Sequence, residues 1–214
     1  MELRGKAFLF DLDGVLVNSR AVVERTWHRW ARRHRIDPDP FLQIAHGRRV
    51  RDTLHAVAPE FATDAEVAWL DNAELHDVEG LRVVPGAREF LSALPGGRWG
   101  IVTSCHRALA LFRLAAAGVP VPEVLVVSED VTRGKPAPDG YRLGAQRLGS
   151  DIADCLVFED APAGVAAGRA AGARVVGLTT THAAQDLKGV EATIPDFSRI
   201  AVRSNGDALI LMLP

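Results

Sequence analysis

Two aspartates separated by one residue follow a short apolar run near the start of the chain. The run Ala7–Phe10 has the length and composition of a strand buried on both faces, and Asp11, Asp13 and Gly14 come after it. In an extended backbone residues two apart point the same way, so the two carboxylates can face one small volume. Such a pair repels itself unless a cation, a proton or a reacting group lies between them. Asp and Gly also form ordinary turns, so this stretch alone leaves a structural turn open.

Polar side chains also follow three later strand-like runs. Each has an ordinary explanation when taken alone, as a strand end, a surface lysine or a helix cap. In doubly wound sheets, however, ligands bind beyond the carboxyl ends of the strands, so these groups are expected to meet in one crevice with the aspartate pair. The polar residues are Thr103 and Ser104, then Lys135, then Glu159 and Asp160.

This set of side chains suits a phosphate ester. An aspartate can attack phosphorus and hold the group as an acyl phosphate, which splits one hard hydrolysis into two easier steps. A second carboxylic acid can protonate the departing alkoxide and then, as a carboxylate, take a proton from water. We assign the first role to Asp11 and the second to Asp13.

Several carboxylates would repel a phosphate dianion unless a cation were present. A hard divalent ion, most simply Mg²⁺, prefers oxygen ligands, and we expect Asp11, Asp160 and the backbone carbonyl of Asp13 to supply them. Glu159 is either a further metal ligand or a partner of the ligands.

The phosphoryl oxygens need hydrogen-bond donors. Lys135, the hydroxyls of Thr103 and Ser104, and the backbone amide of Leu12 are expected to bind them.

Strand-like and helix-like segments alternate over most of the chain, which predicts an α/β fold with a Rossmann-like, doubly wound parallel sheet. Residues 18–81 contain only helical patterns, so we assign residues 1–17 and 82–214 to the core domain and treat 18–81 as a helical insert. Ser19 is expected to cap the first helix of the insert. Apolar segments on either side of Asn205-Gly206 predict a C-terminal β-hairpin. The expected strands of the sheet are 7–10, 99–104, 124–127, 155–158 and 174–178.

Composition excludes several classes of function. A net charge of -2 over 214 residues argues against a nucleic-acid-binding surface. There is no apolar run long enough for a membrane span or a secretion signal, so we expect no membrane partner. The two cysteines, Cys105 and Cys155, are expected to be free thiols in a reducing compartment. We therefore expect a cytoplasmic protein, and a monomer.

The four polar clusters resemble, in order and type, the four motifs of the haloacid dehalogenase-like (HAD) hydrolase superfamily. The resemblance spans nearly the whole chain and implies Mg²⁺-dependent phosphoryl transfer through a phosphoaspartate at Asp11. The helical insert then corresponds to the small cap of the phosphatase and phosphomutase branch. Val15 and Asn18 replace the superfamily's frequent Thr and Asp, and neither change removes a catalytic group. The matching motifs are Asp11-Leu12-Asp13-Gly14, Val102-Thr103-Ser104, Lys135-Pro136-Ala137-Pro138-Asp139 and residues 157–164.

Within that branch, segments 21–34 and 46–49 resemble bacterial sugar and hexitol phosphatases related to yeast 2-deoxyglucose-6-phosphate and glycerol-phosphate phosphatases. The resemblance implies a small sugar or sugar-alcohol phosphate as substrate. His46, Arg48 and Arg49 are the expected contacts from the cap domain, because a polyol suits such donors. An exposed basic helix start is the alternative for these three residues.

Other functions stay open. A β-phosphoglucomutase-like phosphomutase would share all four motifs, but that type places a His near Val23 and an Arg near Val50, so water is the favoured acceptor here. Glycerol phosphate or phosphoglycolate are alternative substrates, and a non-catalytic phosphate-binding module is a further alternative. Haloacid dehalogenation is disfavoured, because that branch usually lacks an acid at the position of Asp13.

Overall fold

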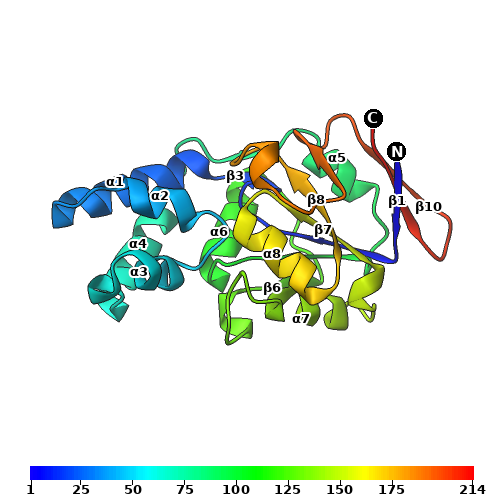
Figure 1. Ribbon diagram of the computed structural model, residues 1–214. Coiled ribbons are helices and arrows are strands. Elements are labelled where there is room, and N and C mark those ends of the chain that lie inside the picture. Colours follow the sequence, from blue (N-terminus) through cyan, green and yellow to red (C-terminus); the bar gives the residue numbers. More distant parts are fainter.

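The computed structural model describes residues 1–214, with a six-stranded parallel sheet at its centre (Figure 1). The strands are β2 (Ala7–Phe10), β5 (Trp99–Val102), β6 (Val124–Val126), β7 (Cys155–Glu159), β8 (Arg174–Leu178) and β9 (Ala192–Ile194). Their order across the sheet is β6-β5-β2-β7-β8-β9, so the chain leaves β2 toward one edge and returns to place β7 on its other side. The strand order therefore reverses between β2 and β7, which confirms the doubly wound α/β fold.

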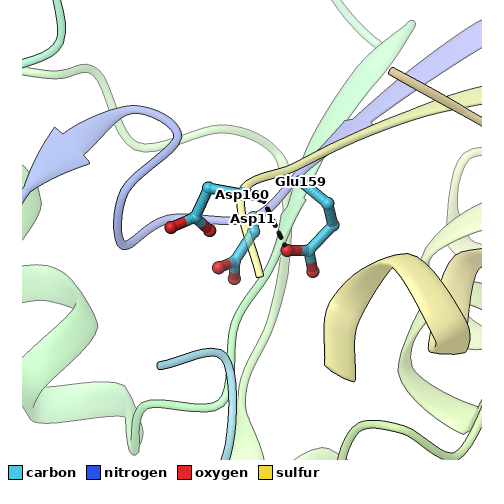
Figure 2. A group of neighbouring side chains, drawn as sticks. All are labelled: Asp11, Glu159 and Asp160. Atoms are coloured by element: carbon cyan, nitrogen blue, oxygen red, sulfur yellow. Dashed lines mark hydrogen bonds between the residues drawn. The ribbon is translucent and has the colours of Figure 1, made fainter. Parts of the chain in front are cut away.

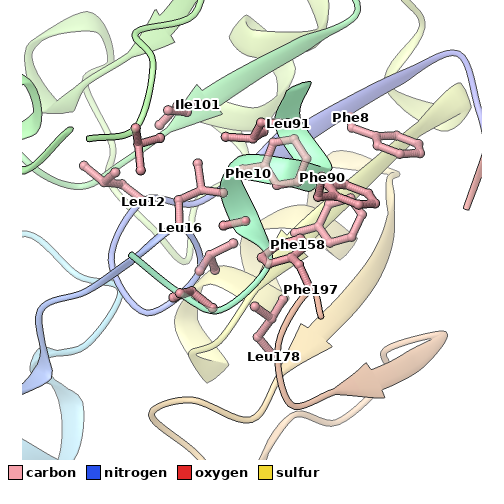
Figure 3. Packing of buried hydrophobic residues seen from close by; sticks show 14 of the residues in the cluster. Phe8, Phe10, Leu12, Leu16, Phe90, Leu91, Ile101, Phe158, Leu178 and Phe197 are labelled. Carbon is pink, nitrogen blue, oxygen red and sulfur yellow. The ribbon is translucent and has the colours of Figure 1, made fainter. Parts of the chain in front are cut away.

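Helices cover both faces of this sheet. Along β2, Phe8 and Phe10 pack on the side of α5 and α6, while Ala7 and Leu9 pack on the side of α7 and α8, as the period of a strand requires. Figure 3 shows the first of these layers, in which the Phe10 ring stacks on that of Phe158 with their centroids 4.7 Å apart. The four helices are α5 (Ala87–Ser92), α6 (Arg107–Ala117), α7 (Asp139–Arg147) and α8 (Pro162–Ala171), with short 3₁₀ turns η2 (Ser128–Asp130), η3 (Ile152–Asp154) and η4 (Ala184–Asp186).

The insert consists of helices that lie to one side of the sheet (Figure 1). They pack around apolar side chains of their own, among them Trp27, Trp30 and Leu54. The chain enters and leaves the insert through two short antiparallel strands, β3 (Val17–Asn18) and β4 (Arg82–Val83). No helix of the protein is long and apolar enough to cross a bilayer. The helices of the insert are α1 (Arg20–His34), α2 (Asp39–Ala45), α3 (Val50–Val57), η1 (Pro59–Phe61) and α4 (Asp64–Leu75).

Ser19 precedes α1 as predicted, but its side chain makes no capping hydrogen bond. Its hydroxyl instead donates to Asp13 Oδ1 at 2.6 Å. The predicted side-chain cap is therefore wrong, because the hydroxyl is used by a carboxylate of the loop before β3.

The predicted C-terminal hairpin is present as β10 (Ala201–Ser204) and β11 (Leu209–Met212). Strand β11 also pairs with the N-terminal strand β1 (Glu2–Gly5), so the two ends of the chain form one three-stranded antiparallel sheet. Leu209 and Leu211 point from β11 into the large apolar cluster beneath the main sheet.

We expect Leu209→Ala to lower the free energy of unfolding by about 2–5 kcal/mol, because Leu209 is fully buried and the substitution leaves a cavity. The neighbouring Ile210 is half-buried, so Ile210→Ala should cost about 1 kcal/mol. Urea denaturation of both variants measures the difference. Equal losses would contradict the burial described for β11.

Candidate active site

Three carboxylates meet where the strand order reverses, at the carboxyl ends of β2 and β7. Asp11 directly follows β2, Glu159 is the last residue of β7, and Asp160 comes next. One oxygen of each carboxylate lies within 4.8 Å of an oxygen of the other two, and all three side chains are buried. Figure 2 shows the three side chains converging from these two neighbouring segments. The structure thus brings together residues that the sequence separates by almost 150 positions.

The ammonium group of Lys135 lies between two of these carboxylates. Its Nζ is 2.7 Å from Asp11 Oδ1 and 2.7 Å from Glu159 Oε1, and it also donates to the Val102 carbonyl at 3.1 Å. Burial alone would lower the pKa of Lys135, but the attraction of Asp11 and Glu159 raises it overall. Lys135 therefore stays charged and fixes the position of Asp11.

Glu159 is completely buried and its carboxylate is held by three donors. Besides Lys135, the Tyr141 hydroxyl donates to Oε1 at 2.5 Å and the Asp160 amide donates to Oε2 at 3.2 Å. Space for this carboxylate exists because residue 164, in the first turn of α8, is a glycine. A Cβ atom on Gly164 would lie 1.8 Å from Glu159 Oε1.

Asp160 supplies the observation that fits a metal. Its Oδ2 accepts a hydrogen bond from the Thr181 hydroxyl, while its Oδ1 is buried and has no partner. A buried carboxylate oxygen without a partner is unfavourable, and a hard divalent cation would supply one. Burial also raises the pKa of Asp11 to about 7, since Glu159 and Asp13 counteract the effect of Lys135. A cation held by Asp11 and Asp160 would favour the ionised form of Asp11.

The residues predicted to bind phosphate have different surroundings. Thr103 is buried at the end of β5, and its Oγ1 accepts from the Cys105 amide at 3.1 Å. Ser104 donates its hydroxyl to the Gly47 carbonyl of the insert at 2.9 Å. Leu12 is buried in the core, so only its backbone is available for the predicted contact. The phosphate contacts of all three residues stay predictions.

Asp13 is not one of the three converging carboxylates, and both its oxygens are engaged. Oδ1 accepts from Ser19, and Oδ2 pairs with Arg113 Nη1 at 2.6 Å and accepts from Cys105 Sγ at 3.0 Å. Arg113 also pairs with Glu74 of α4, Nη2 to Oε2, at 2.5 Å. The carboxylate assigned to acid–base work is thus held in one orientation.

A cavity of about 280 Å³ lies between the sheet and the insert, and Asp11, Asp13 and Thr103 form part of its wall. His46, Arg48 and Arg49 also line this cavity.

The three residues of the insert that were predicted to contact substrate differ in their partners. Arg49 donates to backbone carbonyls of the core at Ser128, Val131 and Thr132, at distances of 3.0, 2.7 and 3.1 Å. It therefore fastens the insert to the core. The His46 ring contacts that of His182 edge to face, with the centroids 6.1 Å apart.

A family model of haloacid dehalogenase-like hydrolases matches residues 6–172 of the chain. The chain belongs to this family. Hexitol phosphatase A of Escherichia coli K12 is 43% identical over 97% of this chain and 100% of its own. Glycerol-1-phosphate phosphohydrolase 2 of Saccharomyces cerevisiae is 34% identical over 88% of this chain and 80% of its own. A solved hydrolase structure from Pseudomonas syringae, 26% identical, matches with a TM-score of 0.79 over 90% of this chain and 94% of that one. The resemblance inferred from the four motifs is confirmed.

In this HAD-like chain, sequence reasoning missed Arg113, Glu74, Tyr141 and Thr181. Arg113 left a signal, because on the helix 107–117 it falls on the same face as the buried Leu109, Leu114 and Ala117. A charged residue on an apolar face of a helix needs a partner of opposite charge.

We expect Gly164→Ala to abolish most of the activity of this HAD-like protein, because the added methyl group would push Glu159 away from Lys135. Alanine is otherwise the better residue in a helix by about 1 kcal/mol, so propensity cannot explain a loss. Gly96→Ala is the matched control, since a Cβ there meets no atom within 4 Å. Phosphate release measures both variants, and an active Gly164→Ala protein would contradict the contact described.

Burial and, to a smaller extent, the nearby His182 lower the pKa of His46 to about 4. The fold therefore favours neutral His46, and the stability that this supplies is present above pH 6.5 and is lost as the pH falls toward 4. As the pH falls between those values, we expect the free energy of unfolding to decrease by about 1–3 kcal/mol less in His46→Gln than in the unmodified protein. Urea denaturation at pH 7.5 and 4.5 measures it, with the exposed His28→Gln as control. An unchanged difference between the two pH values would contradict the neutral state of His46.

Proposed function

We propose that this protein is a Mg²⁺-dependent phosphatase that hydrolyses small sugar or sugar-alcohol phosphate monoesters through a phosphoaspartate at Asp11. The observation that carries this proposal is the buried Asp11 carboxylate, held 2.7 Å from Lys135 and beside the unpartnered Oδ1 of Asp160. Relatives named for action on hexitol and glycerol phosphates support the class of substrate.

In this proposal Asp11, Asp160 and the backbone carbonyl of Asp13 would hold the cation, which would supply charge neutralisation and orientation for the phosphoryl group. An Asp11 oxygen attacks phosphorus while the ester P–O bond breaks, and Asp13 gives its proton to the leaving alkoxide. Asp13 then takes a proton from a water molecule that attacks the phosphorus of phospho-Asp11. This second step regenerates Asp11 and releases inorganic phosphate. Lys135 keeps Asp11 in place throughout.

Residues 18–81 are proposed to act as a cap over this site. The cavity lies between cap and core, so closure of the cap would exclude solvent from it and favour transfer to one bound water over competing reactions. His46 and Arg48 line the cavity and are proposed to bind substrate hydroxyls. Arg49 is retained as a candidate, although both its terminal nitrogens contact core carbonyls.

The cavity wall favours a hydrolase over a phosphomutase. Val23 and Val50 both line the cavity, at the positions where phosphomutases of the β-phosphoglucomutase type place a His and an Arg. Aliphatic side chains there offer no group to bind a second phosphate. A monomeric state and a cytoplasmic location stay predictions.

The test is a phosphate-release screen over hexose, hexitol, glycerol and glycolate phosphates, with Mg²⁺ and with a chelator. We expect hexitol or hexose phosphates to be preferred, and Asp11→Asn to lower kcat by at least about 1,000-fold. Asp154→Asn is the control, because Asp154 pairs with Lys6 on the protein surface, away from the site. Activity that survives Asp11→Asn would contradict the nucleophile, and equal rates on all esters would contradict the substrate class.

A further inference from the structure

Arg113 joins the core to the cap through two carboxylates. It lies on α6 of the core with only 3% of its side chain exposed. Nη1 contacts Asp13 of the core at 2.6 Å, and Nη2 contacts Glu74 of the cap at 2.5 Å. One planar guanidinium therefore bridges the proposed acid–base residue and the last turn of α4.

The cap is seated on the core in this structure. Ser104 donates to the Gly47 carbonyl, and Gly47 lies so close to Ala161 that a Cβ on it would be 2.9 Å from the alanine methyl. The contact between Arg113 and Glu74 belongs to this seated arrangement, because the two residues come from opposite sides of the interface.

The buried charges of Glu74 and Arg113 stabilise each other. Burial raises the pKa of Glu74 to about 7, and Arg113 is the main group that opposes this shift. Arg113 itself lies among apolar side chains of α6, where an unpaired charge is unfavourable. If the cap moved away, Arg113 would keep Asp13 as its only carboxylate partner.

We propose that Arg113 is a positioning residue for Asp13, and that Glu74 fixes the guanidinium only while the cap is seated, so that cap closure sets the acid–base carboxylate. This inference rests on the proposed function, since it assumes that Asp13 protonates the leaving group. The alternative is a static ion pair that only fastens α4 to α6.

A positioning role for Arg113 and a static ion pair predict different effects of the leaving group on kcat/KM. A hexitol phosphate releases an alkoxide, which needs a proton from Asp13, whereas p-nitrophenyl phosphate releases a stable phenolate, which does not. We expect Arg113→Met to lower kcat/KM for sorbitol 6-phosphate by about 100-fold or more, and for p-nitrophenyl phosphate by less than about tenfold. Asp13→Asn provides the reference for complete loss of the acid.

Glu74→Gln tests the link to the cap. We expect it to lower the ratio of kcat/KM for sorbitol 6-phosphate to kcat/KM for p-nitrophenyl phosphate by about 5–20-fold. In a protein that already carries Arg113→Met, Glu74→Gln should have little further effect on this ratio. Asp77→Asn is the matched control, because Asp77 pairs with Arg25 at 2.8 Å entirely within the cap. The control should leave the ratio unchanged.

The outcomes separate the two proposals. If Asp13→Asn leaves the ratio unchanged, the role of Asp13 in the proposed function is wrong. If Asp13→Asn lowers the ratio but Arg113→Met lowers kcat/KM equally for both substrates, the positioning role of Arg113 is overturned. The proposed phosphatase function is then unaffected. Should Arg113→Met fail to fold, Arg113→Lys replaces it, and an unchanged ratio in both Arg113→Lys and Glu74→Gln overturns the inference.

Discussion

The buried ammonium of Lys135 is the charge on which the arrangement of the site depends. It reaches three neighbouring strands at once, through Asp11 after β2, the Val102 carbonyl on β5 and Glu159 on β7. Without it, the carboxylates at the strand order reversal would face one another with no cation of the protein between them. One ammonium cannot neutralise three carboxylates at once, so ionisation of all three requires a further cation, and carboxylate oxygens are ligands that a divalent ion prefers.

The sequence predicts the strand-end residues because a topological rule connects them. Carboxyl ends of parallel strands meet at one edge, so polar residues after apolar runs could be placed together without knowledge of their contacts. The rule gives no help with β9, which is three residues long and only partly buried. The rule also does not predict the pairing of β1 with β11, because no local pattern links segments at opposite ends of the chain.

Residues that act on other side chains were harder to predict than those expected to touch phosphate. Ser19 looks like a helix cap, because nothing local shows that its hydroxyl turns to Asp13. The substrate contact of Arg49 stays a prediction, and its bonds to backbone carbonyls of the core could not be predicted, because carbonyls carry no sequence signal. In both positions the sequence identifies a hydrogen-bonding group, but it does not reveal these partners within the protein.

The use of backbone carbonyls by Arg49 has a consequence for divergence. A substitution at Ser128, Val131 or Thr132 changes a side chain but leaves the carbonyl in place. The Ser104 contact with Gly47 likewise ends on a carbonyl. The contacts of Arg49 are therefore insensitive to which side chains residues 128, 131 and 132 carry, whereas the Ser104 contact depends on glycine at position 47, where a Cβ would lie 2.9 Å from the Ala161 methyl group.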